Sequence, residues 1–138
     1  MYINNVRYSY TLSRPALMVA NPASQSRTTR LLVPSGHTWA SIAAGESHTC
    51  AVTTAGDAYC WGYNGFGQFG DGTTTNRSTP VLVSGGQTWA SVTSGWFRHT
   101  CGVTTGGEAY CWGLNSDGQL GDGTGTNRSV PVKVTIPW

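Results

Sequence analysis

The sequence contains one stretch twice. Residues 99–134 repeat residues 48–83 at a spacing of 51 positions, and 19 of the 27 residues from Asp57 to Val83 are identical to their counterparts. A period near 50 residues is typical of propellers, solenoids and arrays. Because each unit of such a protein buries its apolar face against a neighbouring unit, the array determines the fold.

The composition favours an all-β protein that is rich in turns. The chain has 19 glycines and only 10% charged residues, against about 25% in a typical protein. Six tryptophans and six tyrosines supply enough apolar surface to argue against disorder. No window has the sustained period of an amphipathic helix, and no stretch is long and apolar enough to cross a membrane.

Each repeat contains four short segments with the residues and length of β-strands. In the first unit we expect strands at Trp39–Ala43, His48–Thr53, Ala58–Trp61 and Pro80–Val83, and Trp89–Thr93 begins the second unit. The linker 54–57 has the Gly and Asp that tight hairpins prefer, and a long glycine-rich loop covers residues 62–79. Four short strands in about 40–50 residues are typical of a propeller blade, so we predict blades of four antiparallel strands.

The repeats do not fill the chain. Residues 1–26 match nothing downstream and form an N-terminal segment, while 27–138 carry the repeats: 27–38 as the tail of a preceding unit, 39–88 as the first full unit and 89–138 as the second. About two blades and a partial one make an incomplete ring with open edges. We expect a fragment whose edges are covered by missing blades of a parent chain, or otherwise by self-association.

Several motifs resemble the repeat of the regulator of chromosome condensation family. They are Gly45 to Thr49, Gly56, Tyr59 to Asn64 and Gly67 to Gly72, with a second set at His99-Thr100, Gly107, Tyr110 to Asn115 and Gly118 to Gly123. The resemblance covers roughly residues 27–134 and implies the seven-bladed β-propeller of that family. Seven units of this length would need about 350 residues.

The resemblance predicts a fold better than a function, because one fold hosts many functions. Members of the family include a nucleotide-exchange factor for a small GTPase that binds chromatin, a secreted inhibitor of β-lactamase and a plant UV-B photoreceptor. Our leading hypothesis is a non-catalytic protein-binding module without a cofactor. The alternative is a guanine-nucleotide exchange factor and chromatin binder, and photoreception or enzyme inhibition is more remote.

The four cysteines form two pairs at the same repeat positions. If the first hairpin turns at Ala55, Cys50 faces Cys60, and the same spacing places Cys101 opposite Cys111. Opposing residues of a non-hydrogen-bonded pair lie about 4.5 Å apart at Cα, at the near edge of the disulfide range. We predict two disulfides within blades, with buried free thiols as the alternative. The nine intervening residues do not match the gap of about two to four that zinc sites use.

The repeated polar residues indicate structure more than chemistry. His48 and His99 recur in both units, so we expect each imidazole to bond to backbone inside its blade, since a catalytic base is placed once. Asp71 and Asp122 lie in Gly-Asp-Gly-Thr segments that lack the sequence of a phosphate loop or an EF-hand. We expect these carboxylates to bond loop amides or to meet Arg77 and Arg128.

The second repeat differs from the first at Trp96-Phe97-Arg98, where one extra residue is inserted. Tryptophan and arginine are over-represented at binding hot spots, so we predict that this segment contacts a protein partner. The alternative is that Trp96 packs between blades. Further candidates are loop positions that differ between the units: Tyr63, Phe66, Leu114 and Asp117.

The location of the protein is predicted from its cysteines. Paired cysteines indicate an oxidising compartment, extracellular or at a cell surface. The apolar run 16–20 is short for a signal peptide. Arg7, Arg14, Arg27 and Arg30 are dispersed over the acid-free first 45 residues, which favours a solvated leader over a nucleic-acid contact.

Overall fold

The computed structural model describes residues 2–3, 6–7 and 36–135. The chain divides into two compact units, Met1–Trp39 and Ala40–Trp138. In the first unit β1 (Tyr2–Ile3) pairs with β2 (Val6–Arg7) in an antiparallel manner. The run 16–20, three of the four N-terminal arginines and most of the expected repeat tail 27–38 lie outside the described residues.

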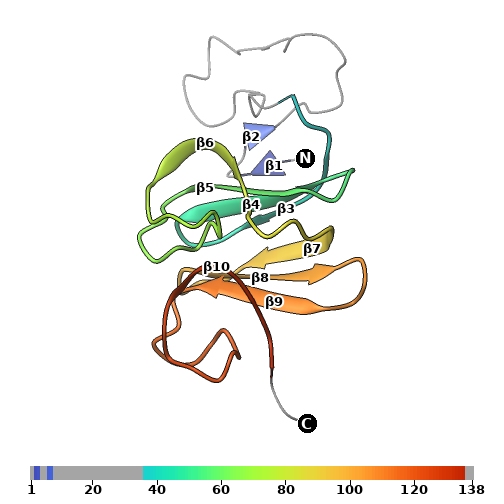
Figure 1. The fold of residues 1–138 in the computed structure, drawn as a ribbon. Helices are drawn as coiled ribbons and strands as arrows, with labels where there is room; N and C mark the ends of the chain where they lie inside the picture. The colour runs from blue at the N-terminus through green and yellow to red at the C-terminus, as the bar shows by residue number, and fades with distance from the viewer. Residues whose placement is uncertain (1, 4–5, 8–35, 136–138) are drawn as a thin grey trace. The chain divides into compact units, whose positions relative to one another are not determined.

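Two four-stranded antiparallel sheets follow, one for each full repeat. The first sheet has the order β3-β4-β5-β6 and the second the order β10-β9-β8-β7. The strands are β3 (Trp39–Ala44), β4 (His48–Thr53), β5 (Ala58–Gly62) and β6 (Arg77–Leu82), then β7 (Trp89–Ser94), β8 (His99–Thr104), β9 (Ala109–Gly113) and β10 (Arg128–Lys133). Two blades are thus present, and they do not close a ring (Figure 1). No helix of the described residues is long and apolar enough to cross a membrane.

The hairpins have the register that the cysteine spacing predicts. Cys50 lies opposite Cys60 and Cys101 opposite Cys111. A disulfide joins each pair, with Cα atoms 4.1 Å and 4.0 Å apart. Each blade therefore has its two middle strands joined covalently near their centre, and the prediction of two disulfides within blades is confirmed.

The fourth strand of each blade begins earlier than expected. β6 starts at Arg77, three positions before Pro80, so the proline lies inside the strand and not at its start. The pairing of β5 with β6 is irregular between Cys60 and Gly62, and β6 is an edge strand. Proline is tolerated there because one side of an edge strand has no neighbouring strand, so an N–H group on that side is not needed for pairing.

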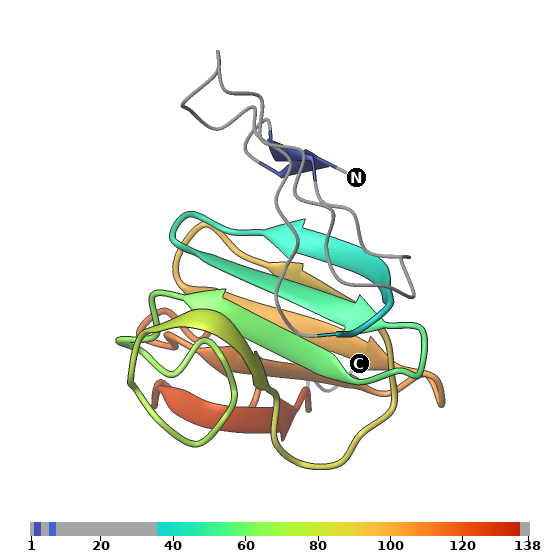
Figure 2. The ribbon, with the colours of Figure 1, turned by 90° about the horizontal axis from the view of Figure 1, so that it is seen from above.

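The core lies between the two sheets, which are stacked face to face (Figures 1 and 2). Trp89 of β7 packs against Trp112 of β9, with ring centroids 5.4 Å apart. The remaining members of this buried cluster are Cys50, Val52, Ala58, Cys60, Phe69, Val83 and Val92. Burying apolar surface against the neighbouring blade is what the repeat pattern predicts.

Buried hydrogen bonds hold the two sheets in register. The hydroxyl of Thr100 donates to the carbonyl of Gln68 over 2.7 Å, and the indole of Trp112 donates to the same carbonyl over 2.9 Å. Gly70 leaves room for that indole, because a Cβ there would lie 2.7 Å from the indole nitrogen. One loop of the first blade is thus shaped around side chains of the second.

The histidines differ from expectation. His48 is buried, and its Nε2 lies 2.9 Å from the Thr100 hydroxyl of the neighbouring sheet. The expected bond to backbone inside its own blade is therefore wrong for His48. His48 thus takes part in the contact between the two blades.

Candidate functional site

Four loops leave one end of the two stacked sheets. They join β3 to β4, β5 to β6, β7 to β8 and β9 to β10, and alternate connections of an antiparallel sheet lie at the same end. All seven predicted contact residues lie on three of these loops: Tyr63, Phe66, Trp96, Phe97, Arg98, Leu114 and Asp117. The topology therefore places at one end positions that are up to 54 residues apart in sequence.

Arg98 connects the loops of the two blades. Its guanidinium lies 5.4 Å from the ring centroid of Tyr63 and 5.5 Å from that of Phe66. The two rings contact each other edge to face, 6.2 Å apart. Cation–π attraction of this kind is worth about 0.5–1 kcal/mol at an exposed site. These three predicted residues form one cluster.

Glu46 completes this cluster and was not among the predicted residues. The Nε of Arg98 lies 3.7 Å from the Glu46 carboxylate, an ion pair without a hydrogen bond. Both side chains are nearly half exposed, so the pair adds little stability. A usable signal was present in the sequence, because Glu46 lies in the loop of the first repeat that corresponds to the loop of Arg98.

The backbone of Arg98 has φ = 57°, the one positive value among the described non-glycine residues. A left-handed conformation costs a residue with a Cβ about 1–2 kcal/mol. The loop between β7 and β8 is one residue longer than its counterpart between β3 and β4. The extra residue is accommodated by this turn, and the carbonyl of Arg98 accepts a hydrogen bond from the amide of Leu114 over 3.0 Å.

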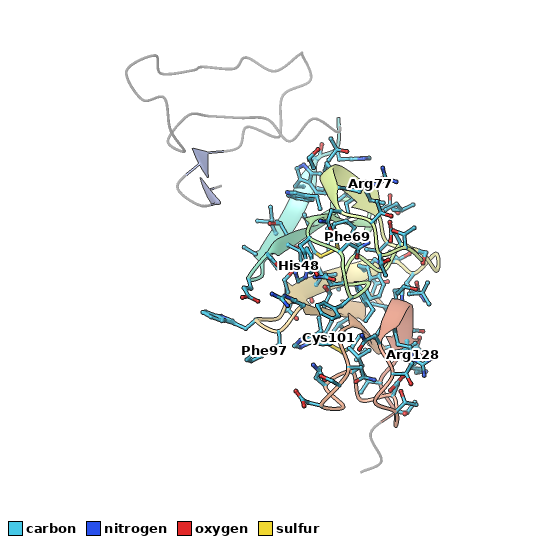
Figure 3. The ribbon with its side chains drawn as sticks, turned by 90° about the vertical axis from the view of Figure 1, so that its left-hand side faces the viewer. His48, Phe69, Arg77, Phe97, Cys101 and Arg128 are labelled. Carbon is cyan, nitrogen blue, oxygen red and sulfur yellow. A yellow bond between two sulfur atoms is a disulfide. The ribbon has the colours of Figure 1, made fainter. Side chains whose placement is uncertain are left out.

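Trp96 and Phe97 are exposed side by side on this loop. The tryptophan is 80% exposed and the phenylalanine 71%. In Figure 3 Phe97 projects from the end of the sheets, whereas His48 lies between them. Trp96 therefore does not pack between the two described blades. We call Tyr63, Phe66, Trp96, Phe97 and Arg98 the aromatic loop surface.

Two other predicted residues, Leu114 and Asp117, lie on the loop between β9 and β10. Leu114 is half-buried, and its amide donates to the carbonyl of Arg98. Asp117 is exposed on a separate turn, where its amide donates to the side chain of Gln119. The structure therefore brings Tyr63, Phe66 and Arg98 into contact, and Trp96 and Phe97 precede Arg98 in the same loop.

An asparagine in each long loop makes that loop rigid. The side-chain amide of Asn64 donates to the carbonyls of Thr73 and Thr75, and its oxygen accepts from the amide of Phe69. Asn115 makes the corresponding bonds in the second blade. Because these asparagines are fully buried, the bonds satisfy groups that water cannot reach. Tyr63 and Phe66 thus project from an ordered loop.

The repeated aspartates stabilise the loops by hydrogen bonds. Asp122 accepts from the hydroxyl of Thr124 and from the guanidinium of Arg128, the latter over 2.8 Å. The Thr124 hydroxyl and then Arg128 hold the pKa of this carboxyl well below its usual range. Asp71 bonds to Thr73 in the same way, but the described residues show no ion pair from Asp71 to Arg77. The expected bond to a loop amide is therefore present in both blades, and the pairing with arginine is seen for Asp122.

The buried histidine is unsuited to proton transfer with solvent. Burial, and secondarily the neighbouring charge of His99, lower the pKa of His48 to about 4. Its exposed fraction is 3%. Among the described residues no group of three or more His, Cys, Asp or Glu side chains is arranged to hold a metal ion.

Known proteins share both the repeats and the fold. Models of the regulator of chromosome condensation (RCC1) repeat match residues 39–68 and 89–119, and residues 55–103 and 106–137. The chain is 41% identical over 109 residues to the ultraviolet-B receptor UVR8 of Arabidopsis thaliana, covering 78% of this chain and 25% of that protein. It is 33% identical over 99 residues to the probable E3 ubiquitin-protein ligase HERC4 of Homo sapiens, covering 70% and 9%. The chain thus spans a quarter or less of these relatives.

Solved structures show the same architecture. Yeast RCC1 (Prp20), in its complex with Kap60, superposes with a TM-score of 0.66 at 24% identity, covering 78% of this chain and 27% of that one. Human WBSCR16 superposes with a TM-score of 0.64 at 25% identity, covering 81% and 29%. The match of the repeat models to more than half of the residues agrees with the two blades described above. The chain belongs to the regulator of chromosome condensation (RCC1) repeat family.

Proposed function

We propose that this chain is a non-catalytic protein-binding module that contacts its partner through the aromatic loop surface. The observation that carries the proposal is the adjacent exposure of Trp96 and Phe97. They lie on the loop where the second repeat departs from the first. Residues that are the same in both blades stabilise the fold. Trp96 and Phe97 are not repeated and are exposed, so we assign them to binding a partner.

The energetics of the surface suit a protein contact. Burying a large apolar side chain contributes about 1.5–3 kcal/mol, and tryptophan and arginine are enriched among hot spots. The Arg98 guanidinium is already stacked on Tyr63 and Phe66. A preordered side chain loses less conformational entropy on binding, so the surface is suited to recognition of a folded or peptide partner.

Related propellers support this use of the fold. One solved structure of yeast Prp20p is described together with its binding properties to Gsp1p and histones, and another shows yeast RCC1 bound to Kap60. Those partners are proteins. We carry over from them the class of ligand and no individual partner.

We further propose that the protein works in an oxidising compartment, outside the cell or at its surface. Two disulfides in a chain with no free cysteine among the described residues support this. Disulfides persist where glutathione and thioredoxin do not reduce thiols. Detection of the protein in the medium of its source cells would test this location.

The binding proposal is tested by photo-crosslinking. A photoreactive phenylalanine analogue placed at position 97 is expected to capture a partner in the native extracellular fluid. The capture should be lost when Trp96→Ala is added to the same chain. A matched variant is Leu82→Ala, which truncates a half-exposed side chain on β6, paired with Tyr59 near the other end of the blade.

Partner capture that persists equally in Trp96→Ala would show that the aromatic loop surface is not the binding site. No captured partner with correctly folded protein would contradict the proposed function itself. Circular dichroism of each variant separates loss of binding from loss of fold.

A further inference from the structure

Corresponding residues of the two repeats differ in burial, because only one of the two corresponding sheet faces is covered by a neighbouring sheet. In the first sheet Val52 is 2% exposed and Ala58 is 1% exposed, because the second sheet packs on them. Their counterparts in the second sheet are Val103, which is 41% exposed, and Ala109, which is also exposed. An apolar face that is core in one blade is therefore surface in the next.

The space around corresponding glycines shows the same difference between the two sheets. A Cβ at Gly56 would lie 2.5 Å from the side chain of Thr88, and one at Gly67 would lie 2.7 Å from the backbone of Ser129. The counterparts Gly107 and Gly118 have nothing within 4 Å. All four have positive φ, so their turns alone require glycine, but the open space shows where a further blade would fit. The carbonyl of Gln68, which accepts two bonds from the second blade, recurs at Gln119.

The residues with which the second sheet contacts the first sheet also have counterparts, on the first sheet. The second sheet presents Val92, Thr100 and Ser129 to the first sheet. The repeat places Ile42, Thr49 and Ser78 at the corresponding positions of the first sheet. Ile42 and Thr49 are partly exposed, whereas Val92 and Thr100 are buried. Within each copy the two sheets therefore form one interface. The two outer faces of the pair, with Ile42 on the first sheet and Val103 on the second, carry the same residue positions as the two sides of that interface.

We propose that a second copy of this chain docks head to tail, with its first sheet on the open face of the second sheet. Ile42 of the incoming copy packs on Val103, and the Thr49 hydroxyl donates to the carbonyl of Gln119. This new contact repeats, at corresponding residues, the contact that β4 and β7 make within one chain.

A head-to-tail contact between unlike faces either closes a ring or continues as an open array. Propellers typically have about four to eight blades. With two described blades in each copy, a closed ring of three or four copies has six or eight blades.

The experiment measures self-association of the full chain by sedimentation velocity over a wide range of concentration. The unmodified protein is expected to form oligomers larger than a dimer. Val103→Glu places a charge on the open face and Ile42→Glu places one on the complementary face, and each should weaken self-association by roughly tenfold or more. The matched control is Val130→Glu, since Val130 is 43% exposed and lies near Gly72 of its own chain. This control should associate like the unmodified protein.

Mixing the two weakened variants distinguishes a head-to-tail contact from a symmetric one. Val103→Glu retains the Ile42 face and Ile42→Glu retains the Val103 face, so the mixture should form a one-to-one dimer that grows no further. A protein that stays monomeric at every concentration would overturn the proposal. Undiminished association of Val103→Glu would overturn it as well. Far-ultraviolet circular dichroism and intact mass, with both disulfides present, establish that each variant is folded.

Discussion

The imidazole of His48 and the hydroxyl of Thr100 meet 2.9 Å apart across the boundary between the two sheets. Both residues are buried, and the hydroxyl also donates to the carbonyl of Gln68. Because the hydroxyl donates its single proton to that carbonyl, it accepts a hydrogen bond from Nε2 of His48. The repeat is thus connected from blade to blade through a polar chain as well as through apolar packing.

The first prediction concerns this hydroxyl. Thr100→Val should lower the free energy of unfolding by about 1–3 kcal/mol, because it leaves the buried Nε2 of His48 without its hydrogen-bond partner and removes one of the two bonds to the Gln68 carbonyl. Urea unfolding of dilute protein measures the change. The matched control is Thr49→Val at the same position of the first blade, where the side chain is partly exposed and the cost should be small. Equal costs in the two variants would contradict the role assigned to Thr100.

A pH dependence follows from the buried histidine. The pKa of His48 is lowered from 6.5 to about 4 in the folded protein, so the unfolded chain binds a proton more readily. The contribution of neutral His48 to the free energy of unfolding is therefore fully present above pH 6.5. It is lost as the pH falls through 4, by up to about 3 kcal/mol. Urea midpoints between these two pH values measure the slope. His48→Gln should flatten it, and an unchanged slope would assign it to other groups.

The disulfides should differ in their rate of reduction. Cys50 and Cys60 have no exposed surface, whereas Cys101 is partly exposed on the second blade. Thiolate attack requires access to a sulfur, so Cys101–Cys111 should be reduced first by a soluble reductant. Timed alkylation with peptide mass spectrometry follows both pairs. Alkylation of all four thiols before any reductant is added would refute the disulfides altogether.

The left-handed turn at Arg98 separates stability from binding. Arg98→Gly relieves a positive φ of 57°, whereas Arg98→Ala keeps the strain and loses the ring contacts. The glycine variant should be more stable than the alanine variant by roughly 1 kcal/mol. Both variants should bind a partner of the aromatic loop surface less tightly than the unmodified protein. Thermal melts compare the stability of the two variants. Equal stability of Arg98→Ala and Arg98→Gly would show that the turn is unstrained.

Local pairing was predictable from the sequence because it joins residues that are close along the chain. The hairpin register that opposes Cys50 and Cys60 follows from a short linker and a period of two. The blade was predictable for the same reason, and its copying at 51 residues implied neighbours that bury apolar faces. The start of β6 was missed, because an irregularity that no residue preference signals separates its first pair, Arg77 with Gly62, from the pair of Val81 with Cys60.

The candidate site was predictable only as a set of positions at which the two repeats differ. Their spatial grouping depends on loops from different blades, so the stacking of Arg98 on Tyr63 and Phe66 could not be read from spacing. Glu46 was missed for that reason. The exposure of Trp96 was equally open, because tryptophan is found both in cores and at binding surfaces.

The sequence by itself determined the repeat, the four strands of each blade and the cysteine pairs, because these depend on contacts within one unit. The tertiary structure alone decided what lies between units: the partner of His48, the indole over Gly70 and the cluster around Arg98. Val52 and Val103 show the reason most directly, since they occupy the same position in sequence and in strand. One is buried and the other exposed, because burial depends on the neighbouring blade and not on the residue itself.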